Sequence, residues 1–387
     1  MENLTHSLLG AAIAELALPR TATPPQRRLF FTVGVIASNL PDADLVYTSV
    51  TPPPLGYLLH HRGHTHTLVG LVAQGLLVAA ICLAPAVRRH IGPLRRRLWM
   101  LIAVSLLGHL VLDSWNSYGV HPFYPFDMRW YYGDAIFIVE PWLWLFLGVA
   151  AMANTRSRRT RFGLGALIAL LAVAFTTVGM LDAGALVALA FVAVAAWWLT
   201  STWSSHTRSG AALAATALFV AMMFGLSAIA EARVLASLRP SIRGEIVDVV
   251  LNPSAAKPLC WSALVIEKDE RGGAYTMKRG ALSLVPRWMP VSGCGVRPGV
   301  EIAWTDAQQQ SLAKLRERAR ADCRVRAWLQ FGRAPVLTAG EIADLRFGDT
   351  SRGNFTDMPL TPSDPDAACP AHLTHWAMPR EDLLASP

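Results

Sequence analysis

The chain has 387 residues, of which 53% are hydrophobic and 16% are charged, and its formal net charge is +8 at pH 7. Its mean hydropathy of +0.34 is high for a soluble protein of this length. Several apolar runs approach the roughly 20 residues that a helix needs to cross a bilayer. The composition therefore excludes an ordinary soluble protein and predicts a polytopic membrane protein.

The apolar runs predict seven or eight helices. The first two runs, at about 5–18 and 29–40, are short for a membrane span unless the helices tilt or the bilayer thins. The longer runs are expected to be transmembrane helices and lie at about 67–87, 98–113, 135–153, 163–181, 184–200 and 211–230. No basic segment precedes the first run and no clear cleavage site follows it, so we expect no cleavable signal peptide.

The placement of arginine predicts the orientation of the helices. Up to residue 230 the chain has fifteen Arg and no Lys, and most of these arginines lie in short segments that alternate with the apolar runs. The positive-inside rule makes such segments cytoplasmic loops. The positive charge then marks the cytoplasmic loops, which lie beside anionic lipid. We therefore expect no nucleic-acid partner. Alternation places residues 60–67, the loop after residue 113 and everything after residue 230 outside, at the extracytoplasmic face of a bacterial inner membrane.

The segment HHRGHTHT, residues 60–67, contains four of the eleven histidines. Taken alone, it could be a polar loop of biased composition. The predicted topology, however, brings further imidazole and carboxylate side chains to the same face. These are His6, Asp42, Asp44, His109, Asp113, His121, Asp127, Asp134, Glu140 and Asp182. Because the Arg residues and the His and Asp residues sort to opposite faces, we predict a metal site.

Each part of this group has a simpler explanation when taken alone. His109 and Asp113 are four residues apart on a predicted helix and so share one face, which also suits a capping hydrogen bond. Asp42 and Asp44, in NLPDADL, could belong to an ordinary turn. His6 could be a polar residue at the membrane interface. An ionisable side chain near the end of a span is costly unless it is paired, metal-bound or solvated, and together these residues favour a metal.

Imidazole and carboxylate ligands without thiolate suit Zn²⁺, with Mn²⁺ or Fe²⁺ as alternatives. One ion would acidify a water molecule, and two ions would clamp the attacking and leaving oxygens of a displacement. His121, Asp127 and Asp134 could supply a second ion. Asn116 and Tyr118 could orient a substrate. Arg62 and Arg129 could bind phosphate, although snorkelling to the headgroups explains Arg129 equally well.

These residues resemble the YdjM-like family of membrane-bound metal-dependent hydrolases. The resemblance covers roughly residues 1–150 and rests on the ordered motifs LTHSLLG, LPDAD, HRGHTH, GHLVLDSWNSYG and GDAIFIVEPW. The polar positions that it implies are His6, Asp42, Asp44, His61, Arg62, His66, His109 and Asp113. His60 and His64 are additional histidines in this chain and are not expected to be ligands.

The family is in turn similar to the zinc phospholipase C and single-strand nuclease superfamily, whose helical fold holds zinc ions that cleave phosphoesters. That similarity implies one ion held by four residues, with a second ion bridged by the last of them. The four are Asp42, His66, His109 and Asp113. The later His and Glu ligands of the superfamily have only approximate counterparts here, in His121, Asp127 and Asp134.

After residue 230 the composition changes, and all four Lys of the chain appear. The segments 244–253, 260–269, 274–286 and 325–332 are patterned as short strands, and 305–328 is patterned as one amphipathic helix. We expect a small α+β domain with a loosely ordered tail from about 353. Two disulfides are plausible in an oxidising compartment, with four reduced thiols as the alternative. The cysteines concerned are Cys260, Cys294, Cys323 and Cys369, and their spacing does not define the pairing.

The sequence thus predicts an all-α membrane bundle of about seven or eight helices followed by a small α+β soluble domain. Residues 1–153 would be a metal-dependent hydrolase domain, 154–230 additional transmembrane helices, and 231–387 an extracytoplasmic domain. The expected function is hydrolysis of a phosphoester, which could be lipid-linked, by metal-activated water, with catalytic roles for Asp44, Arg62 and Asn116. The expected metal ligands are His6, Asp42, Asp44, His61, His66, His109, Asp113, His121 and Asp134. The alternative is a non-catalytic metal-binding or transport protein. The sequence does not define the oligomeric state.

Overall fold

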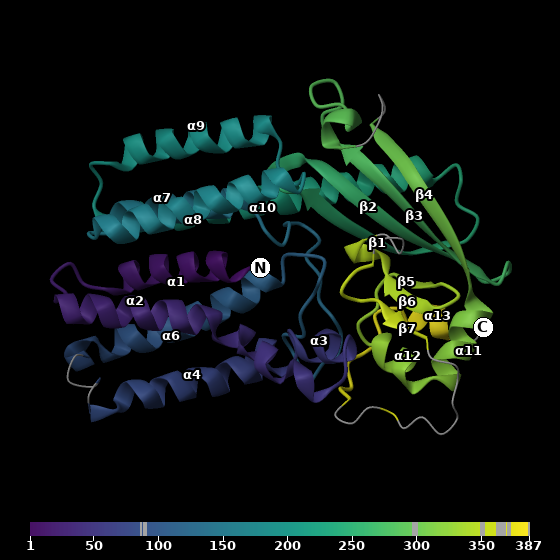
Figure 1. Cartoon of the computed structure of the whole chain (residues 1–387), viewed down its shortest axis with the longest axis horizontal. Helices are drawn as coiled ribbons and strands as arrows, with labels where there is room; N and C mark the ends of the chain where they lie inside the picture. Colours follow the sequence, from purple (N-terminus) through teal and green to yellow (C-terminus); the bar gives the residue numbers. More distant parts are fainter. Residues whose placement is uncertain are drawn as a thin grey trace.

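The computed structural model describes residues 1–85, 87, 91–295, 301–348, 353–360, 369 and 373–385. Its first part is a bundle of long helices, and its C-terminal part lies against one end of that bundle (Figure 1). The bundle helices are α1 (Asn3–Ala17), α2 (Pro24–Asn39), α4 (Leu68–Leu83), α6 (Arg95–Asp113), α7 (Pro141–Asn154), α8 (Arg158–Thr177), α9 (Ala183–Thr200) and α10 (Ser205–Leu238). The prediction of a helical bundle followed by an α+β region is confirmed in this broad form.

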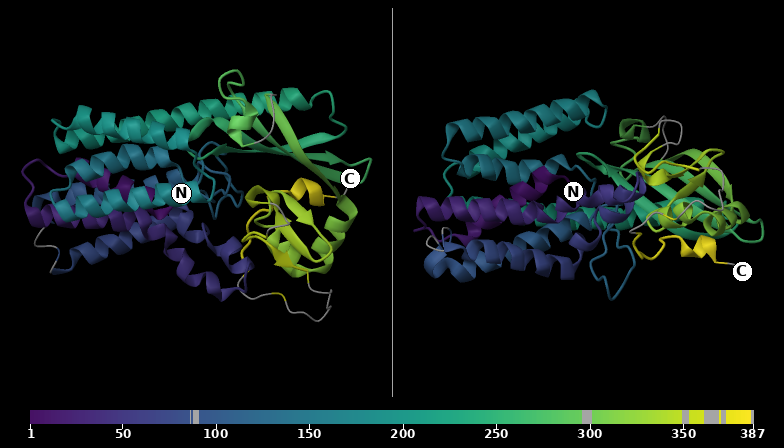
Figure 2. Two further views of the ribbon diagram at one scale, coloured as in Figure 1. Left: turned by 45° about the horizontal axis from the view of Figure 1, so that its top comes forward. Right: turned by 60° about the horizontal axis from the view of Figure 1, so that its bottom comes forward.

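Successive bundle helices run in opposite directions, so alternate connections gather at the same end (Figures 1 and 2). The connections α1–α2, α4–α6, α7–α8 and α9–α10 form the end farther from the C-terminal region, which we call the basic end. Arg20, Arg27, Arg95, Arg156 and Arg208 lie in or beside these connections. The opposite end carries the His- and Asp-rich segments. The structure therefore separates the two kinds of residue along the bundle axis, as the sequence predicted.

Within the described residues, four helical segments are long and apolar enough to cross a membrane. They are Pro24–Val50, Arg158–Thr177, Ala183–Thr200 and Ser205–Leu238. Leu55–His66 and Leu68–Leu83, bent by 68° at their junction, would together make a fifth. Two of the predicted spans have different limits in the structure. The run at 135–153 becomes helical at Pro141, where the Glu140 side chain accepts a hydrogen bond from Trp142 N, and 211–230 is the middle of the 34-residue helix α10.

Close packing of α1 on α2 fixes the position of two site segments. A Cβ atom at Gly10 would lie 2.3 Å from the Gly34 carbonyl oxygen, so a larger residue cannot occupy this crossing without moving a helix. Small residues allow helix backbones to approach closely in a membrane. The contact holds the first turn of α1, which carries His6, against the end of α2, which leads into the 3-10 segment η1 (Leu40–Val50).

The C-terminal region contains two antiparallel sheets. The larger has the order β1 (Glu245–Ser254), β2 (Lys257–Asp269), β3 (Ala274–Ser283) and β4 (Ile302–Ser311). The smaller has the order β5 (Pro335–Leu337), β6 (Glu341–Asp344) and β7 (Met358–Pro359). Helices α11 (Leu312–Ala321), α12 (Cys323–Trp328) and α13 (Glu381–Leu384) accompany them. The predicted strands at 244–253, 260–269 and 274–286 correspond to β1, β2 and β3.

The prediction of one helix over 305–328 is wrong. Residues up to Ser311 continue β4, which pairs with the edge of β3 and places Trp304 opposite Gly280. The helix starts only where the Ser311 side chain accepts from Lys314 N, and the Asp322 side chain then caps the separate helix α12. The predicted strand at 325–332 is wrong as well. Val325 and Trp328 are buried three residues apart on α12, a helical spacing that is also compatible with an apolar strand.

The C-terminal region shares a hydrophobic core with the site end of the bundle. Leu58 and Leu59 of the short helix α3 (Leu55–His60) belong to the same buried cluster as Trp328 and Phe331. The expected boundary at residue 230 falls inside α10, which continues to Leu238. The C-terminal region is thus packed on the bundle through a shared core as well as connected to it by α10.

Two disulfides join parts of the C-terminal region. Cys260 is bonded to Cys294, and Cys323 is bonded to Cys369, while Cys82 is free and buried in α4. The predicted loose tail falls partly on residues 361–368 and 370–372, which lie outside the described residues. Of the described tail residues, Trp376 and Leu383 are buried.

Candidate metal centre

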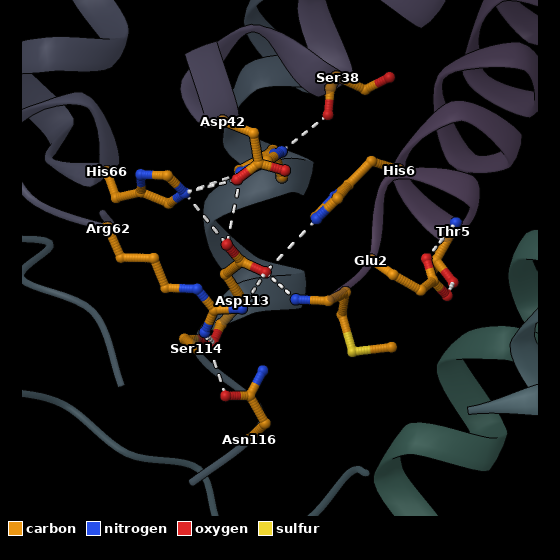
Figure 3. Close-up of polar contacts among 12 residues, drawn as sticks. Glu2, Thr5, His6, Ser38, Asp42, Arg62, His66, Asp113, Ser114 and Asn116 are labelled. Atoms are coloured by element: carbon orange, nitrogen blue, oxygen red, sulfur yellow. Dashed lines mark hydrogen bonds and ion pairs between the residues drawn. The ribbon is translucent and has the colours of Figure 1, made fainter. Parts of the chain in front are cut away.

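Four side chains from three segments meet at the site end of the bundle (Figure 3). Asp42 comes from η1, His66 from the 3-10 turn η2 (His64–His66), and His109 and Asp113 from the last turns of α6. All four are buried. One ligand atom from each lies within 4.8 Å of every other, a grouping that could hold a metal ion. The structure therefore brings together residues up to 71 positions apart in the chain.

The hydrogen bonds of the two imidazoles define their tautomers. His109 Nδ1 lies 2.7 Å from the Ser38 carbonyl oxygen, which can only accept, so Nδ1 carries the proton. Thr65 Oγ1 donates to Asp44 Oδ2 at 2.8 Å and can therefore accept from His66 Nδ1, which is 3.0 Å away. When both rings are neutral, as metal-binding imidazoles are, Nε2 of each ring is then left without a proton and can bind a cation. Metal-binding histidines in proteins are oriented in the same way, through a hydrogen bond from the other nitrogen.

The Nε2 atoms of the two rings point at each other. His66 Nε2 and His109 Nε2 are 3.0 Å apart. The Oδ2 atom of Asp113 lies 3.1 Å from the first and 3.4 Å from the second. The Oδ1 atom of Asp42 lies 3.5 Å and 3.6 Å from the same two atoms. Lone pairs and negative charges at this spacing repel one another unless a cation lies among them, so the group is electrostatically complementary to a positive ion.

A second group lies beside the first. Asp42 also belongs, with Asp44 and His61, to a second set that could hold an ion. Asp44 is tightly held there, because its Oδ1 is 3.0 Å from His61 Nδ1 and its Oδ2 accepts from Arg62 N at 2.9 Å. The carboxylate common to both sets is thus Asp42, whereas the superfamily resemblance implied a bridge through Asp113.

Arg62 supplies a buried positive charge to the centre. Its Nη2 donates to Asp113 Oδ1 at 3.0 Å, and its Nη1 donates to the Asp113 carbonyl oxygen and to Asn116 Oδ1, both at 3.1 Å. The guanidinium also lies 4.7 Å from the ring centre of Tyr118. Asn116 therefore positions Arg62, and Arg62 offsets part of the negative charge of the site.

The structure places His6 at the edge of the centre. Its ring stacks on that of His109 with centroids 3.8 Å apart, and its Nε2 lies 3.4 Å from Asp113 Oδ1. The same oxygen contacts the amino group of Met1. His6 is adjacent to the four-residue group without belonging to either candidate set.

His121 and Asp134 belong to neither candidate set, although His121 Nδ1 lies 3.4 Å from the Arg62 carbonyl oxygen. The His121 ring packs between Trp130 and Trp376, with ring centroids 3.7 and 4.0 Å away, and burial lowers its pKa to about 3. Asp134 forms an ion pair with Arg333 at 2.8 Å. Burial raises the pKa of Asp134 although Arg333 opposes the shift. Both residues join the loop after α6 to the C-terminal region.

The remaining predicted polar residues have partners outside the two candidate sets. Arg129 is exposed and pairs with Asp127 at 2.7 Å. His64 contacts the rings of Tyr124 and Trp376. His60 Nε2 lies 2.8 Å from Thr51 Oγ1. The structure thus separates His61 and His66, which face the centre, from His60 and His64, which do not.

Two groups that orient the ligands were missed in the sequence. The Ser38 carbonyl is a backbone atom, so no side-chain pattern could indicate it. Thr65 stands between His64 and His66 in HTH and links Asp44 to His66. The C-terminal region also contributes, since Arg346 Nη1 donates to the Ser117 carbonyl oxygen at 2.8 Å and Trp376 Nε1 to the Leu59 carbonyl oxygen at 2.8 Å. These contacts fix the backbone at Ser117 and Leu59, near the site, to the C-terminal region.

The fold and the site together define a polytopic membrane protein with a buried His and Asp group suited to a divalent ion. Residues 1–183, a little under half of the chain, match the family described as YdjM inner membrane protein. The resemblance inferred from the motifs is therefore confirmed at the level of the family. The family and the apolar helices support a location in a bacterial inner membrane.

Two curated relatives match the N-terminal part of the chain. Uncharacterized protein YfhP of Bacillus subtilis (strain 168) is 26% identical over 148 residues, which is 38% of this chain and 43% of that protein. Inner membrane protein YbcI of Escherichia coli (strain K12) is 36% identical over 116 residues, which is 30% of this chain and 61% of that protein. Each match thus spans less than two thirds of the relative. No solved structure matches the chain.

Proposed function

We propose that the chain is a membrane-bound metal-dependent hydrolase that cleaves a phosphoester at the extracytoplasmic face of the inner membrane. One observation carries the proposal. The Nε2 atoms of His66 and His109 face each other at 3.0 Å, and Asp42 and Asp113 add one carboxylate oxygen each within 3.6 Å of these nitrogens.

The residues present fit a divalent ion. Ligand atoms bound tetrahedrally at about 2.1 Å lie roughly 3.4 Å apart, and the contacts above fall around that value. Asp113 Oδ2 is buried and has no hydrogen-bond donor among the described residues. Two imidazoles with two carboxylates favour Zn²⁺, with Mn²⁺ or Fe²⁺ as alternatives, over the all-oxygen sites of Mg²⁺ and Ca²⁺.

When bound, a divalent ion supplies a Lewis acid that polarises a phosphoryl oxygen and lowers the pKa of water. The side chains around it have separate roles. Asp44 holds His61 through Nδ1 and, with Thr65, holds His66. Arg62 places positive charge beside Asp113 and is oriented by Asn116, where it would offset negative charge that develops on a phosphoryl group. Asp42 would bridge two ions if both sets are filled.

The surroundings of the site favour a phosphoester attached to a lipid. Segment η1, which carries Asp42 and Asp44, also exposes Leu45, Val46 and Val50. Tyr57 stacks beside His61 and is itself partly exposed. Apolar side chains next to a polar site at the end of a bundle suit a substrate whose headgroup enters the site while its chains stay in the bilayer.

The alternative is a protein that binds or transports a metal without hydrolysis. A transport path requires polar residues deep within the spans. Helices α8 and α9 contain no His, Asp or Glu. The structure therefore offers no such path through these two helices.

The decisive experiment compares the wild type with His109→Ala. We expect the wild-type protein to contain a divalent metal and to hydrolyse a chromogenic phosphodiester or phosphomonoester, and His109→Ala to lose both. His206→Ala is the matched control, because His206 lies at the basic end, where it hydrogen-bonds the Leu18 carbonyl oxygen. Equal metal content in all three proteins with no hydrolysis by any of them would end the proposal. Metal lost with His109 but no turnover would favour the non-catalytic alternative.

The extracytoplasmic orientation can be measured by cysteine labelling in intact cells. We expect His64→Cys to react with a membrane-impermeant maleimide from outside, and Ser157→Cys to react only after the cells are opened. The background is low, since Cys82 is buried and the other four cysteines are disulfide-bonded. The reverse labelling pattern would place the site in the cytoplasm.

A further inference from the structure

A pocket lies at the basic end of the bundle, on the far side from the metal centre. It has a volume of about 330 Å³ and is formed by α1, α2, α7 and the start of α8. Its wall is apolar and includes Ala11, Phe31, Leu147 and Ala150. Phe31 is half-exposed, whereas Leu147 and Ala150 are buried. The pocket thus has an apolar interior.

The rim of this pocket is basic. Arg27, Arg28 and Arg156 line it together with Ser157, Thr160 and one acidic residue, Glu15. Arg27 is already paired, because its Nη1 lies 3.3 Å from Glu15 Oε1. Arg28 and Arg156 are exposed, and in the described part of the chain neither has an acidic partner within ion-pair distance. Two positive charges are therefore available beside an apolar pocket.

The segment that carries Arg156 is held in place by the structure. Arg161 donates through Nη2 to the Thr155 carbonyl oxygen at 2.8 Å and through Nε to the Met152 carbonyl oxygen at 3.2 Å. Thr155 N and Oγ1 in turn bond the Ala151 carbonyl oxygen. Arg156, which lines the pocket together with Arg28 of α2, is therefore carried by a fixed turn.

We propose that this pocket binds an anionic phospholipid, with the phosphate between Arg28 and Arg156 and part of an acyl chain against the apolar wall. Charge complementarity supports the phosphate, since basic pockets between membrane helices bind anionic headgroups and arginine suits phosphate oxygens. The apolar wall supports a lipid over a soluble phosphate, which would leave that wall in water. Such a lipid would tie the α1–α2 hairpin to α7 and α8.

The experiment uses the full-length protein in a mild detergent and native mass spectrometry. The probes are phosphatidylglycerol, phosphatidylcholine with the same acyl chains, and soluble glycerol 3-phosphate. We expect tight binding of phosphatidylglycerol only. Each arginine near a lipid headgroup contributes about 1 kcal/mol, so Arg28→Gln with Arg156→Gln should weaken phosphatidylglycerol binding roughly 20- to 30-fold.

Two further variants test whether binding depends on the position of the charges and on the apolar wall. Arg158→Gln with Arg159→Gln removes the same charge from exposed positions outside the pocket, and it should leave binding unchanged. Ala151→Leu narrows the pocket without changing charge, and it should weaken phosphatidylglycerol binding. Four results would each overturn the proposal. Two concern the variants: an equal loss of phosphatidylglycerol binding in both double variants, or full phosphatidylglycerol binding by Ala151→Leu. Two concern the wild type: phosphatidylcholine binding as tight as that of phosphatidylglycerol, or displacement of phosphatidylglycerol by glycerol 3-phosphate.

Discussion

Asp42→Asn is expected to disrupt the candidate centre more than any other carboxylate substitution in it. Asp42 is the carboxylate common to both candidate metal sets. Its Oδ1 faces the nitrogens of His66 and His109 at 3.5 and 3.6 Å. An amide there removes a negative charge and leaves a weaker ligand for either ion. We expect metal content to fall to background and hydrolysis to fall on the order of a thousandfold, which corresponds to about 4 kcal/mol of transition-state stabilisation.

Asp44→Asn is the matched comparison. The carboxylate oxygens of Asp44 accept hydrogen bonds from His61, the Arg62 backbone N–H and Thr65. Asp44 therefore orients other ligands in addition to any direct binding of a metal ion. Substitutions of such orienting groups typically cost 10- to 100-fold in metal affinity or activity. The number of metal ions per chain, measured by mass spectrometry, and the hydrolysis rate show which of the two variants loses more metal and more activity. A larger loss for Asp44→Asn would show that the principal ion lies in the second set.

The sequence could predict the parts of the site that depend on local spacing. His109 and Asp113 are one helical turn apart, and the structure keeps them on one face of α6. Local spacing alone could not rank the four histidines of residues 60–67, and the choice of His61 and His66 came from the family resemblance. Their directions depend on where α3 ends and η2 begins, and the packing of His64 on Trp376 depends on a residue more than 300 positions away. Composition indicated the segment, the family resemblance indicated the choice within it, and the tertiary structure gives the physical reason for that choice.

His121 and Asp134 also show that tertiary contacts cannot be predicted from local sequence. Both lie near the site in sequence and at the predicted face, which made them reasonable candidates for a second ion. Their actual partners, Trp376 and Arg333, come from the C-terminal region. A sequence pattern cannot indicate that a distant domain will supply a cation or an aromatic ring. The incorrect helix over 305–328 has a similar origin, because the pairing of β4 with β3 overrides the local helical pattern.

Arg333 is the residue whose loss should most weaken the joint between the C-terminal region and the bundle. Its guanidinium binds Asp248 through Nε at 2.7 Å and Asp134 through Nη2 at 2.8 Å. It also lies 4.1 Å from the ring centre of Tyr132. All of these groups are largely shielded from water. Removing one partner of a buried ion pair leaves an uncompensated charge and typically costs about 3–5 kcal/mol.

Arg333→Met should therefore lower the free energy of unfolding by about 3–5 kcal/mol at pH 8. The loss should shrink as the pH falls. In the wild type Arg333 holds the pKa of Asp248 below its usual value, although burial opposes the shift. That carboxylate stabilises the fold above its unfolded pKa, and the contribution is lost as the pH falls through the lower folded pKa. Without Arg333, burial raises the pKa of Asp134 further, whereas Asp248 keeps an ion pair with Arg380 at 3.2 Å, so protonation of Asp134 toward pH 5 removes part of the penalty.

Urea unfolding followed by tryptophan fluorescence at pH 8 and pH 5 measures both effects, since Trp261 and Trp328 are buried in this region. Arg129→Met is the control, because Arg129 is exposed and pairs with Asp127 at the surface, where ion pairs contribute little. A loss for Arg333→Met that is independent of pH would assign the effect to lost packing on Tyr132. An unchanged free energy of unfolding would show that the joint does not depend on this ion pair and is held by the shared hydrophobic core of α3 and the C-terminal helices.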